Sequence, residues 1–295
     1  MRFLFPFLFL VVGGWAQAQT IDTIEIPGTA IAFQLSLIKG GHFVYHGVEV
    51  QLDGFWMGTH EVTHDEFVLF KERSFDSDQS NWKEGEYQAD AVTRPSPPYL
   101  DFTYGMGTKG GFPAVSMTQQ SALRYCYWLY QKTGHFYRLP TEVEWTYACQ
   151  LATFESLDDY AWHYENSNEK YQKVGQKKPN AYGLYDILGN VAEWTLDQYK
   201  KDYAAAIENS KNPWIKPTKK HSRTIKGGSF DSDAAECTCE QRTKSQAKWQ
   251  ARDPQIPKSE WWNTDSPFLG FRLVRPEKQP SQAEIEAFFK EAIKF

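Results

Sequence analysis

Alternating apolar and polar positions mark the first elements of the chain. The alternation covers residues 32–37 and 48–52, and glycine-containing turns lie between and after these two segments. A period of two residues bounded by turn signals is typical of half-buried β-strands. Thr63 is followed three residues later by Glu66, a capping-box pattern that predicts a short helix. The chain is therefore expected to begin with β-strands and to continue into a helix.

Three further helices are indicated by a helical period or by capping residues. The clearest opens at residues 116–120 and ends at Gly134, with a buried stripe made of Ala122, Tyr125, Cys126, Leu129 and Tyr130. Thr141, with Glu144 three residues later, caps a second helix. Residues 281–295 form the third. This last helix is expected to dock on the domain, with partner binding as the alternative, through Ile285, Phe288, Phe289 and Ile293.

One long segment lacks any sustained period. Residues 76–111 contain repeated Pro and Gly, so we expect a long surface excursion there.

The N-terminal residues have the pattern of a secretory signal. Met1 and Arg2 precede the apolar residues 3–12, and residues 16–18 (AQA) have the small-x-small pattern that signal peptidase recognises. The apolar run is too short to span a bilayer, and no comparable run follows. We therefore expect residues 1–18 to be a cleaved signal peptide and residues 19–295 to form a single soluble domain. The protein is expected to be periplasmic or secreted, without a transmembrane segment; a buried N-terminal strand is the alternative interpretation.

Composition narrows the partners that can be expected. The formal net charge is −5, and no segment is basic enough to form a nucleic-acid footprint, so no nucleic-acid partner is expected. Aromatic residues make up 16% of the chain. Such a content suits a loop-rich fold in which large rings fill space, and it also suits a cleft for carbohydrate or peptide.

Sequence strings spread over most of the chain resemble the formylglycine-generating, sulfatase-modifying family. They occur in order at residues 57–63 (MGTHEVT), 112–116 (FPAVS), 125–129 (YCYWL), 137–148 (YRLPTEVEWTYA), 180–195 (NAYGLYDILGNVAEWT), 226–230 (KGGSF) and 269–272 (LGFR). The resemblance implies an α+β fold related to C-type lectins, with much irregular structure. Arg138 is placed to form a buried ion pair with Glu142 or Glu144, and Trp145 and Trp194 would fill the core.

Residues 186–193 are expected to hold a structural calcium ion. Carboxylates lie at both ends of this segment with backbone carbonyls between them, a set of oxygen ligands that calcium accepts. The resemblance implies the same ligands, namely the side chains of Asp186 and Glu193 and main-chain groups near Gly189 and Val191. The alternative is an exposed Asp186 and a structural Glu193.

A second metal site of the family is incomplete in this chain. The resemblance implies that the enzymes bind Cu(I) through two cysteines five residues apart and use it with dioxygen to oxidise a substrate cysteine. Counted from Ser229, the two positions are Ser232 and Cys237 here. Cu(I) prefers soft thiolates, whereas a serine hydroxyl is hard and protonated. We therefore expect no copper site of this kind, and Ser229, Ser232 and Cys237 are candidate catalytic residues only if an altered site is active.

The cysteines leave two interpretations open. Cys237 and Cys239 form a C-x-C pair that could hold a soft metal or act as a redox dithiol. The simpler interpretation, which the resemblance supports, is that disulfides join Cys237 and Cys239 to Cys126 and Cys149. Some family members have a bridging cysteine where this chain has Leu273, so the resemblance does not define the pairing.

Residues 253–267 form the candidate ligand-binding loop. The adjacent Trp261 and Trp262 have polar neighbours and could stack on a peptide or a sugar, although core packing of at least one of them is equally compatible with the sequence. We expect a ligand groove where this loop meets Arg252 and Arg272.

Three functions follow from these features. A non-catalytic binding or scaffolding module of the cell envelope, with a peptide or protein partner, is favoured because Ser232 replaces one of two thiolate ligands. One alternative is an oxidoreductase that converts a peptide cysteine to formylglycine at an altered metal site. The other is a related oxidative enzyme that acts on a small or peptidic substrate.

Overall fold

The computed structural model describes residues 19–71, 103–150, 155–250 and 266–294. The expected signal peptide, most of the expected surface excursion and most of the candidate ligand-binding loop lie outside these residues. Within the described ranges, no helix is both long and apolar enough to cross a bilayer.

The strands form three small sheets that join distant parts of the chain. The first sheet is antiparallel and has the order β1 (Ile21–Glu25), β2 (Ala32–Ile38), β5 (Phe55–Gly58), β11 (Val274–Pro276). The second has the order β10 (Leu269–Gly270), β6 (Ala192–Gln198), β8 (Arg223–Lys226), β9 (Thr243–Lys244). The third has the order β3 (Gly41–Tyr45), β4 (Val48–Leu52), β7 (Ser210–Lys211). The expected N-terminal strands are confirmed as β2 and β4.

Four helices, α1, α2, α3 and α6, begin where the sequence predicted them, whereas α4 and α5 were not predicted. They are α1 (His64–Lys71), α2 (Gln119–Thr133), α3 (Glu142–Gln150), α4 (Leu157–Tyr160), α5 (Tyr203–Ile207) and α6 (Gln282–Ala292), with 3₁₀ turns at Ala234–Glu236 and Ala247–Gln250. Glu66 N–H donates to Thr63 Oγ1, and Glu144 N–H donates to Thr141 Oγ1. Gly134 ends α2 with a φ of 76°, a left-handed conformation that glycine adopts without strain.

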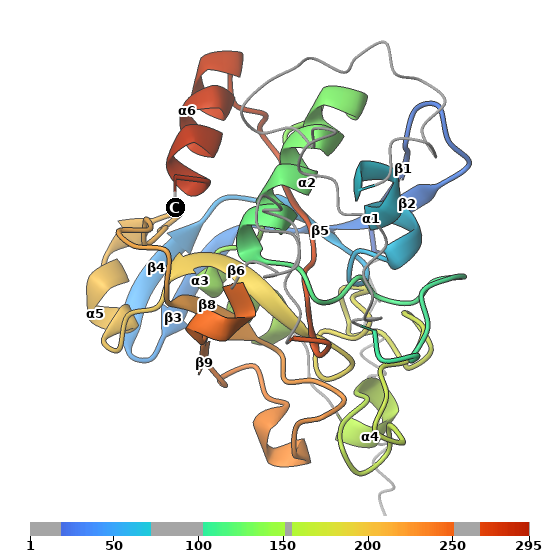
Figure 1. The fold of residues 1–295 in the computed structure, drawn as a ribbon. Coiled ribbons are helices and arrows are strands. Elements are labelled where there is room, and N and C mark those ends of the chain that lie inside the picture. Colours follow the sequence, from blue (N-terminus) through green and yellow to red (C-terminus); the bar gives the residue numbers. More distant parts are fainter. Residues whose placement is uncertain (1–18, 72–102, 151–154, 251–265, 295) are drawn as a thin grey trace, which may run out of the picture.

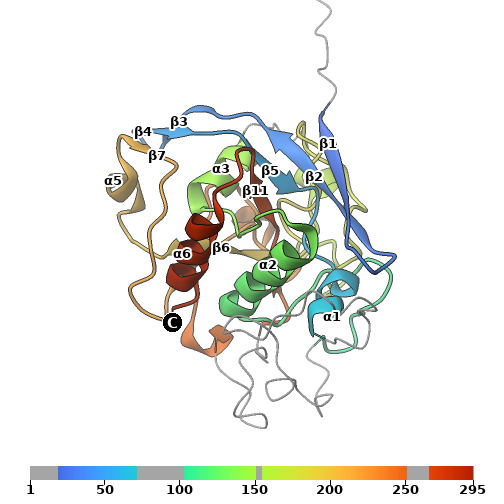
Figure 2. The same cartoon turned by 90° about the horizontal axis from the view of Figure 1, so that it is seen from above.

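The terminal helix docks as the apolar face predicted. Phe289 on α6 packs against Tyr127 on α2, with ring centroids 4.9 Å apart, and against Phe136 at 5.6 Å. Figures 1 and 2 show α6 lying beside α2 in both views. Ser281 caps α6 with a complete capping box to Glu284. The docked helix extends the core around α2 to the C-terminal end of the described chain.

The core divides into two large apolar clusters. The first surrounds α2 and includes Cys126, Trp194 and Phe271. The second lies between α3 and the third sheet and includes Trp145 and Cys149. Trp145 and Trp194 are both fully buried, as expected. Helices and strands thus both contribute to one core, which confirms the expected α+β class.

The buried cap of α1 makes stability pH-dependent. Burial raises the pKa of Glu66 to about 7 from an ordinary value of 4.5, and the Thr63 hydrogen bonds only partly oppose this. Because folding favours the protonated carboxyl, its contribution to stability is complete below about pH 4.5 and is lost as the pH rises through about 7. Glu66→Gln keeps the acceptor for Thr63 but cannot ionise. Between pH 5 and pH 8 the variant is expected to lose about 2–3 kcal/mol less stability than the wild type.

Urea denaturation at the two pH values measures this difference, and comparing the two proteins cancels the other titrating groups. An equal loss in both proteins would mean that Glu66 does not titrate in this range.

Candidate functional site

Ser229, Ser232 and Cys237 lie together in the loop after β8. We call this loop the 229–237 corner. Ser229 N–H donates to Ser232 Oγ at 3.1 Å, and the two hydroxyl oxygens are 3.3 Å apart. Gly228 has a φ of 72°, and a Cβ atom there would lie 2.7 Å from Cys237 Sγ. Glycine is therefore required for the thiol to approach the chain at this position.

The Cys237 thiol is buried and protonated. It is 2% exposed. Burial raises its pKa to about 12, and the nearby Glu236 and Glu165 carboxylates act in the same direction. Backbone amides of Ser229 and Gly189 partly oppose this rise. The corner therefore offers one protonated thiol and two hydroxyls, a donor set that does not fit Cu(I), since this ion requires soft, deprotonated sulfur.

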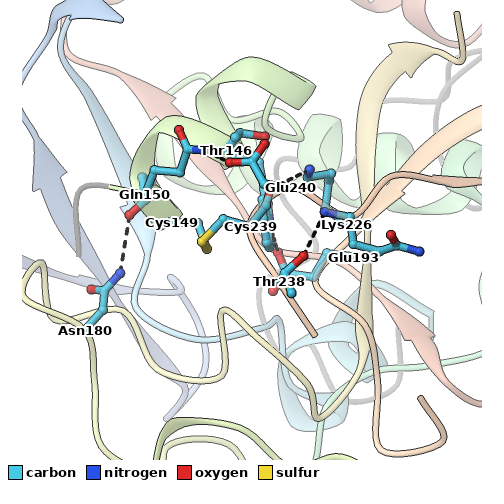
Figure 3. Close-up of a disulfide and its surroundings, with 12 residues drawn as sticks. Thr146, Cys149, Gln150, Asn180, Glu193, Lys226, Thr238, Cys239 and Glu240 are labelled. Carbon is cyan, nitrogen blue, oxygen red and sulfur yellow. Dashed lines mark hydrogen bonds between the residues drawn. A yellow bond between two sulfur atoms is a disulfide. The ribbon is translucent and has the colours of Figure 1, made fainter. Parts of the chain in front are cut away.

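The structure contains one of the two expected disulfides among its described residues. Cys149 on α3 is bonded to Cys239, as Figure 3 shows. Their Cα atoms are 5.6 Å apart. Cys126 and Cys237 are free thiols, so the expectation of a second disulfide is wrong. Cys126 belongs to the cluster around α2, whereas Cys237 belongs to the cluster around α3. The core separates these two cysteines, and the C-x-C pair is not a free dithiol because Cys239 is already bonded.

The expected calcium loop is buried and lies against the 229–237 corner. Gly189 N–H donates to the carbonyl of Gly227, and Phe230 N–H donates to the carbonyl of Asn190. Gly189 has a φ of 74°, and a Cβ there would meet the Trp162 carbonyl oxygen at 2.2 Å. Asp186 is 1% exposed and accepts from Gly175 N–H through Oδ2 at 2.6 Å.

Glu193 and Arg272 form an internal ion pair. Arg272 Nε lies 2.9 and 3.0 Å from the two carboxylate oxygens, and Nη2 donates to Oε1 at 2.7 Å. Trp145 Nε1 donates to Oε2 at 2.8 Å. These bonds take up the roughly four acceptor positions of a carboxylate. Glu193 in this arrangement is therefore a partner of Arg272 rather than a calcium ligand.

Arg272 does not line a groove. Its side chain has no exposure, and it also donates to the carbonyls of Gly58 and Tyr185. The reason is local: residues 271–273 lie between β10 and β11, two strands of different sheets, so the guanidinium points into the space between them. Arg252, Trp261 and Trp262, the other expected groove residues, lie outside the described residues.

Glu61 is the residue that the sequence reasoning missed. It is fully buried, and its Oε1 accepts from Asn190 Nδ2 at 3.0 Å. Burial and the neighbouring Asp186 carboxylate raise its pKa well above the ordinary range, while Arg272 opposes this. Burial likewise raises the pKa of Asp186 to about 6. The signal was present in the sequence, because Glu61 lies inside the family string at residues 57–63.

The donor set around Asp186 fits a hard cation. Asp186 Oδ1 and Glu61 Oε2 are buried and have no hydrogen-bond partner among the described residues. Among the residues that the structure describes, no group of three or more His, Cys, Asp and Glu side chains is arranged to hold a metal ion. A cation here would therefore be bound by few carboxylates and by carbonyl oxygens, a ligand mixture that calcium accepts.

A cavity of about 350 Å³ lies elsewhere, where α3 and α6 begin. It is lined by Arg138, Glu144 and Lys278 among others, and it contains none of the expected site residues. Arg138 binds both oxygens of Glu144 at 2.6 and 2.7 Å, so the expected ion pair at the start of α3 is confirmed with Glu144. Glu142 pairs instead with Arg242. The charges of Arg138 and Glu144 in the cavity lining thus neutralise each other, and the cavity is not the candidate site.

The fold and the two adjacent candidate sites define a mixed helix-and-strand domain with a loop-built site. The family described as "Sulfatase-modifying factor enzyme 1-like domain" matches residues 22–276, and the chain belongs to this family. The formylglycine-generating enzyme of Mus musculus is 29% identical over 150 residues, which cover 44% of this chain and 38% of that protein.

Two further similarities extend over more of the chain. The serine/threonine-protein kinase pkn1 of Chlamydia pneumoniae is 26% identical over 251 residues, which cover 80% of this chain and 38% of that protein. The matched part is thus well under half the length of both curated relatives. The solved structure of Treponema denticola variable protein 1 is similar in fold, with a TM-score of 0.60 and 21% identity over 87% of this chain and 99% of that one.

Proposed function

We propose that this chain is a non-catalytic binding or scaffolding domain of the cell envelope. The observation that carries the proposal is the donor set of the 229–237 corner. Ser232 occupies the first position of the expected cysteine pair, and the Cys237 thiol at the second is buried with a pKa of about 12. A protonated thiol and a hydroxyl supply neither the thiolates that Cu(I) prefers nor a nucleophile at neutral pH.

The arrangement of the corner supports a structural role for it. Ser232 Oγ accepts a hydrogen bond from the Ser229 amide, and Cys237 belongs to the same apolar cluster as Trp145. The bonded Cys239 two residues later fixes the same segment to α3. Ser229, Ser232 and Cys237 thus each have a structural partner.

The domain is further proposed to hold one structural calcium ion at residues 186–191. Asp186 and main-chain carbonyls near Gly189 and Val191 would bind it, and its charge would neutralise buried carboxylates in a part of the core where the loop has little regular structure. The unpartnered Asp186 Oδ1 supports this part of the proposal.

Export and a partner complete the proposal. The leader-like pattern of residues 1–18 supports a periplasmic or secreted protein. A peptide or protein is the partner class, because the aromatic residues 261 and 262 lie in a polar segment suited to stacking on such a ligand.

Copper binding tests the non-catalytic proposal. The purified wild type is expected to take up no Cu(I) from a competing chelator in an anaerobic titration. Ser232→Cys restores the two-cysteine spacing and is expected to raise Cu(I) affinity at least a hundredfold, since a second thiolate is worth on the order of several kcal/mol. Ser232→Cys combined with Cys237→Ala is the matched control and is expected to lose this gain.

Copper binding by the wild type would contradict the proposal. If the wild type binds one equivalent of Cu(I) and loses it on Cys237→Ala, the oxidoreductase alternative replaces the proposal. Oxidation of a cysteine-containing peptide by that copper-loaded wild type would then identify the enzyme.

A further inference from the structure

Arg223 on β8 is a buried cation that has only neutral partners among the described residues. Its side chain is 2% exposed. Nε donates to Gln119 Oε1 at 2.7 Å, and Nη1 donates to Gln198 Oε1 at 2.8 Å and to the Lys219 carbonyl at 2.9 Å. The third nitrogen, Nη2, forms no hydrogen bond within the described ranges and is not fully enclosed, so a ligand can reach it from outside.

Asp197 is the carboxyl group that acts on the Arg223 guanidinium, and it does not neutralise it. Burial raises the pKa of Asp197 to about 8, and the Glu142 carboxylate acts in the same direction, so the group is largely protonated at neutral pH. Its two oxygens accept from the amides of Glu142 and Ile215. Burial also lowers the pKa of Arg223 to about 10. A desolvated guanidinium without a counter-charge is costly, and an anion would offset that cost.

Further positive charge lies in the same segment. Residues 209–230 contain six lysine and arginine residues and no aspartate or glutamate, although the whole chain has a net charge of −5. Lys219 is exposed and Lys220 is half-buried, and neither forms an ion pair with a residue that the structure describes. By contrast, the exposed Lys178 and Lys211 each pair with an aspartate. The two lysines beside Arg223 are therefore available to a partner.

The potential at this position is positive from two other sources as well. Burial lowers the pKa of His221, and the charges of Lys220 and Arg223 lower it further. Gln119, which binds Arg223, is the first residue of α2, and the first turn of this helix contains no acidic residue. The N-terminal end of a helix carries a partial positive charge. An anion at Arg223 would thus be attracted by the lysines and by the helix end together.

The surrounding surface favours a protein over a membrane as the source of this anion. The exposed large apolar side chains in the described part of the chain are Ile21, Val44, Tyr104 and Tyr164, and none of them belongs to residues 216–223. A few lysines without an apolar side chain to insert hold a protein only weakly at an anionic membrane. Carboxylates are the anions that proteins carry, and they match the planar guanidinium of arginine.

We propose that Arg223, Lys219 and Lys220 bind a carboxylate-rich segment of a partner protein. Arg223 Nη2 donates to one carboxylate, and the two lysines pair with its neighbours. The partner supplies the anion that the buried guanidinium lacks, so the contact gives specificity for acidic segments. This inference rests on the proposed binding role and names the surface and the charge of the partner.

Peptide binding to matched variants tests the surface. The probe is a fluorescein-labelled peptide of alternating glutamate and serine, and its binding is followed by fluorescence anisotropy. The same peptide with glutamine in place of glutamate is the neutral control. The purified wild type is expected to bind only the acidic peptide, and to bind it more weakly as NaCl is added, because salt screens exposed charges. Lys219→Gln combined with Lys220→Gln is expected to weaken binding about tenfold.

Two further variants make the result specific. Lys178→Gln combined with Lys211→Gln changes the net charge by the same amount and is expected to change the affinity by less than about twofold, since these lysines lie in other ion pairs. Arg223→Lys keeps the positive charge but loses the guanidinium fork, and about tenfold weaker binding is expected. Its melting temperature shows whether it is folded. Should it fail to fold, the two lysine double variants still decide the result.

Three results would overturn the inference. The first is no binding of the acidic peptide by the wild type, and the second is equal affinity in the two lysine double variants. The third is binding to phosphatidylglycerol vesicles in preference to the peptide, which would assign the surface to a membrane. The copper titration tests the non-catalytic proposal separately, so either proposal can fail while the other stands.

Discussion

Arg272→Met is expected to lower the free energy of unfolding by about 3–5 kcal/mol, because it leaves Glu193 charged and buried without its cation. Met fills a similar length of space but donates no hydrogen bond. Besides Glu193, the carbonyls of Gly58 and Tyr185 lose their donor. Removing one partner of a buried pair is far more costly than the pair itself contributes, since the remaining charge keeps its full desolvation penalty.

Arg275→Met is the matched control. Arg275 lies three residues further along the chain and pairs with Asp22, whose side chain is 38% exposed. Arg275 is itself buried and lies over the Trp56 ring, but water can replace it at the partly exposed Asp22, so the expected loss is smaller, about 1–2 kcal/mol. Urea denaturation in the presence of EDTA compares the two variants without any contribution from bound calcium. Equal losses in both would show that Glu193 does not depend on Arg272.

A double variant measures the pair itself. Arg272→Met combined with Glu193→Leu removes both charges and is expected to recover part of the loss, because no buried charge remains unpaired. No recovery would mean that Arg272 acts mainly through the two carbonyls.

Removal of the Cys149–Cys239 disulfide is expected to be the second large effect. The bond closes a loop with a sequence separation of 90 residues. Opening a loop of this size increases the entropy of the unfolded chain, and a loss of about 2–5 kcal/mol is expected for Cys149→Ala combined with Cys239→Ala. Lys226 donates to the Cys239 carbonyl at 2.8 Å beside the bond (Figure 3), so the freed segment keeps one attachment.

Cys237→Ala is the control for this prediction. It removes a buried sulfur from the same apolar cluster but breaks no cross-link, so it is expected to cost only about 1 kcal/mol. Thermal unfolding with and without dithiothreitol completes the comparison. The wild type and Cys237→Ala should lose stability on reduction, whereas the double variant should not respond. A double variant as stable as the wild type would contradict the cross-link.

The features that local sequence predicted well share one physical basis. The caps at Thr63 and Thr141 each bind a glutamate three residues later, so both partners lie within one helical turn. The apolar face of the terminal helix also follows from spacing alone. Such features can be predicted from the local sequence, without knowing which distant segments pack nearby.

The site was predicted less well, because its partners come from distant parts of the sequence. Arg272 is 79 residues from Glu193 and 214 from Gly58, and Asn190 is 129 residues from Glu61. The family strings place each of these side chains in the site region, but they do not predict which donor and which acceptor form a hydrogen bond. Glu193 was therefore assigned to calcium although the structure pairs it with Arg272, and Glu61 was not considered.

By itself, the sequence determined the starts of α1, α2, α3 and α6, the strands β2 and β4, the two central tryptophans and the family to which the chain belongs. Ser232 was also evident from the sequence, as the residue that interrupts the cysteine pair. Only the tertiary structure decided that Cys149 bonds Cys239 while Cys126 stays free, and that Arg272 is internal. The physical reason is that pairing depends on which faces of distant segments meet in one apolar cluster, and a one-dimensional pattern does not contain that choice.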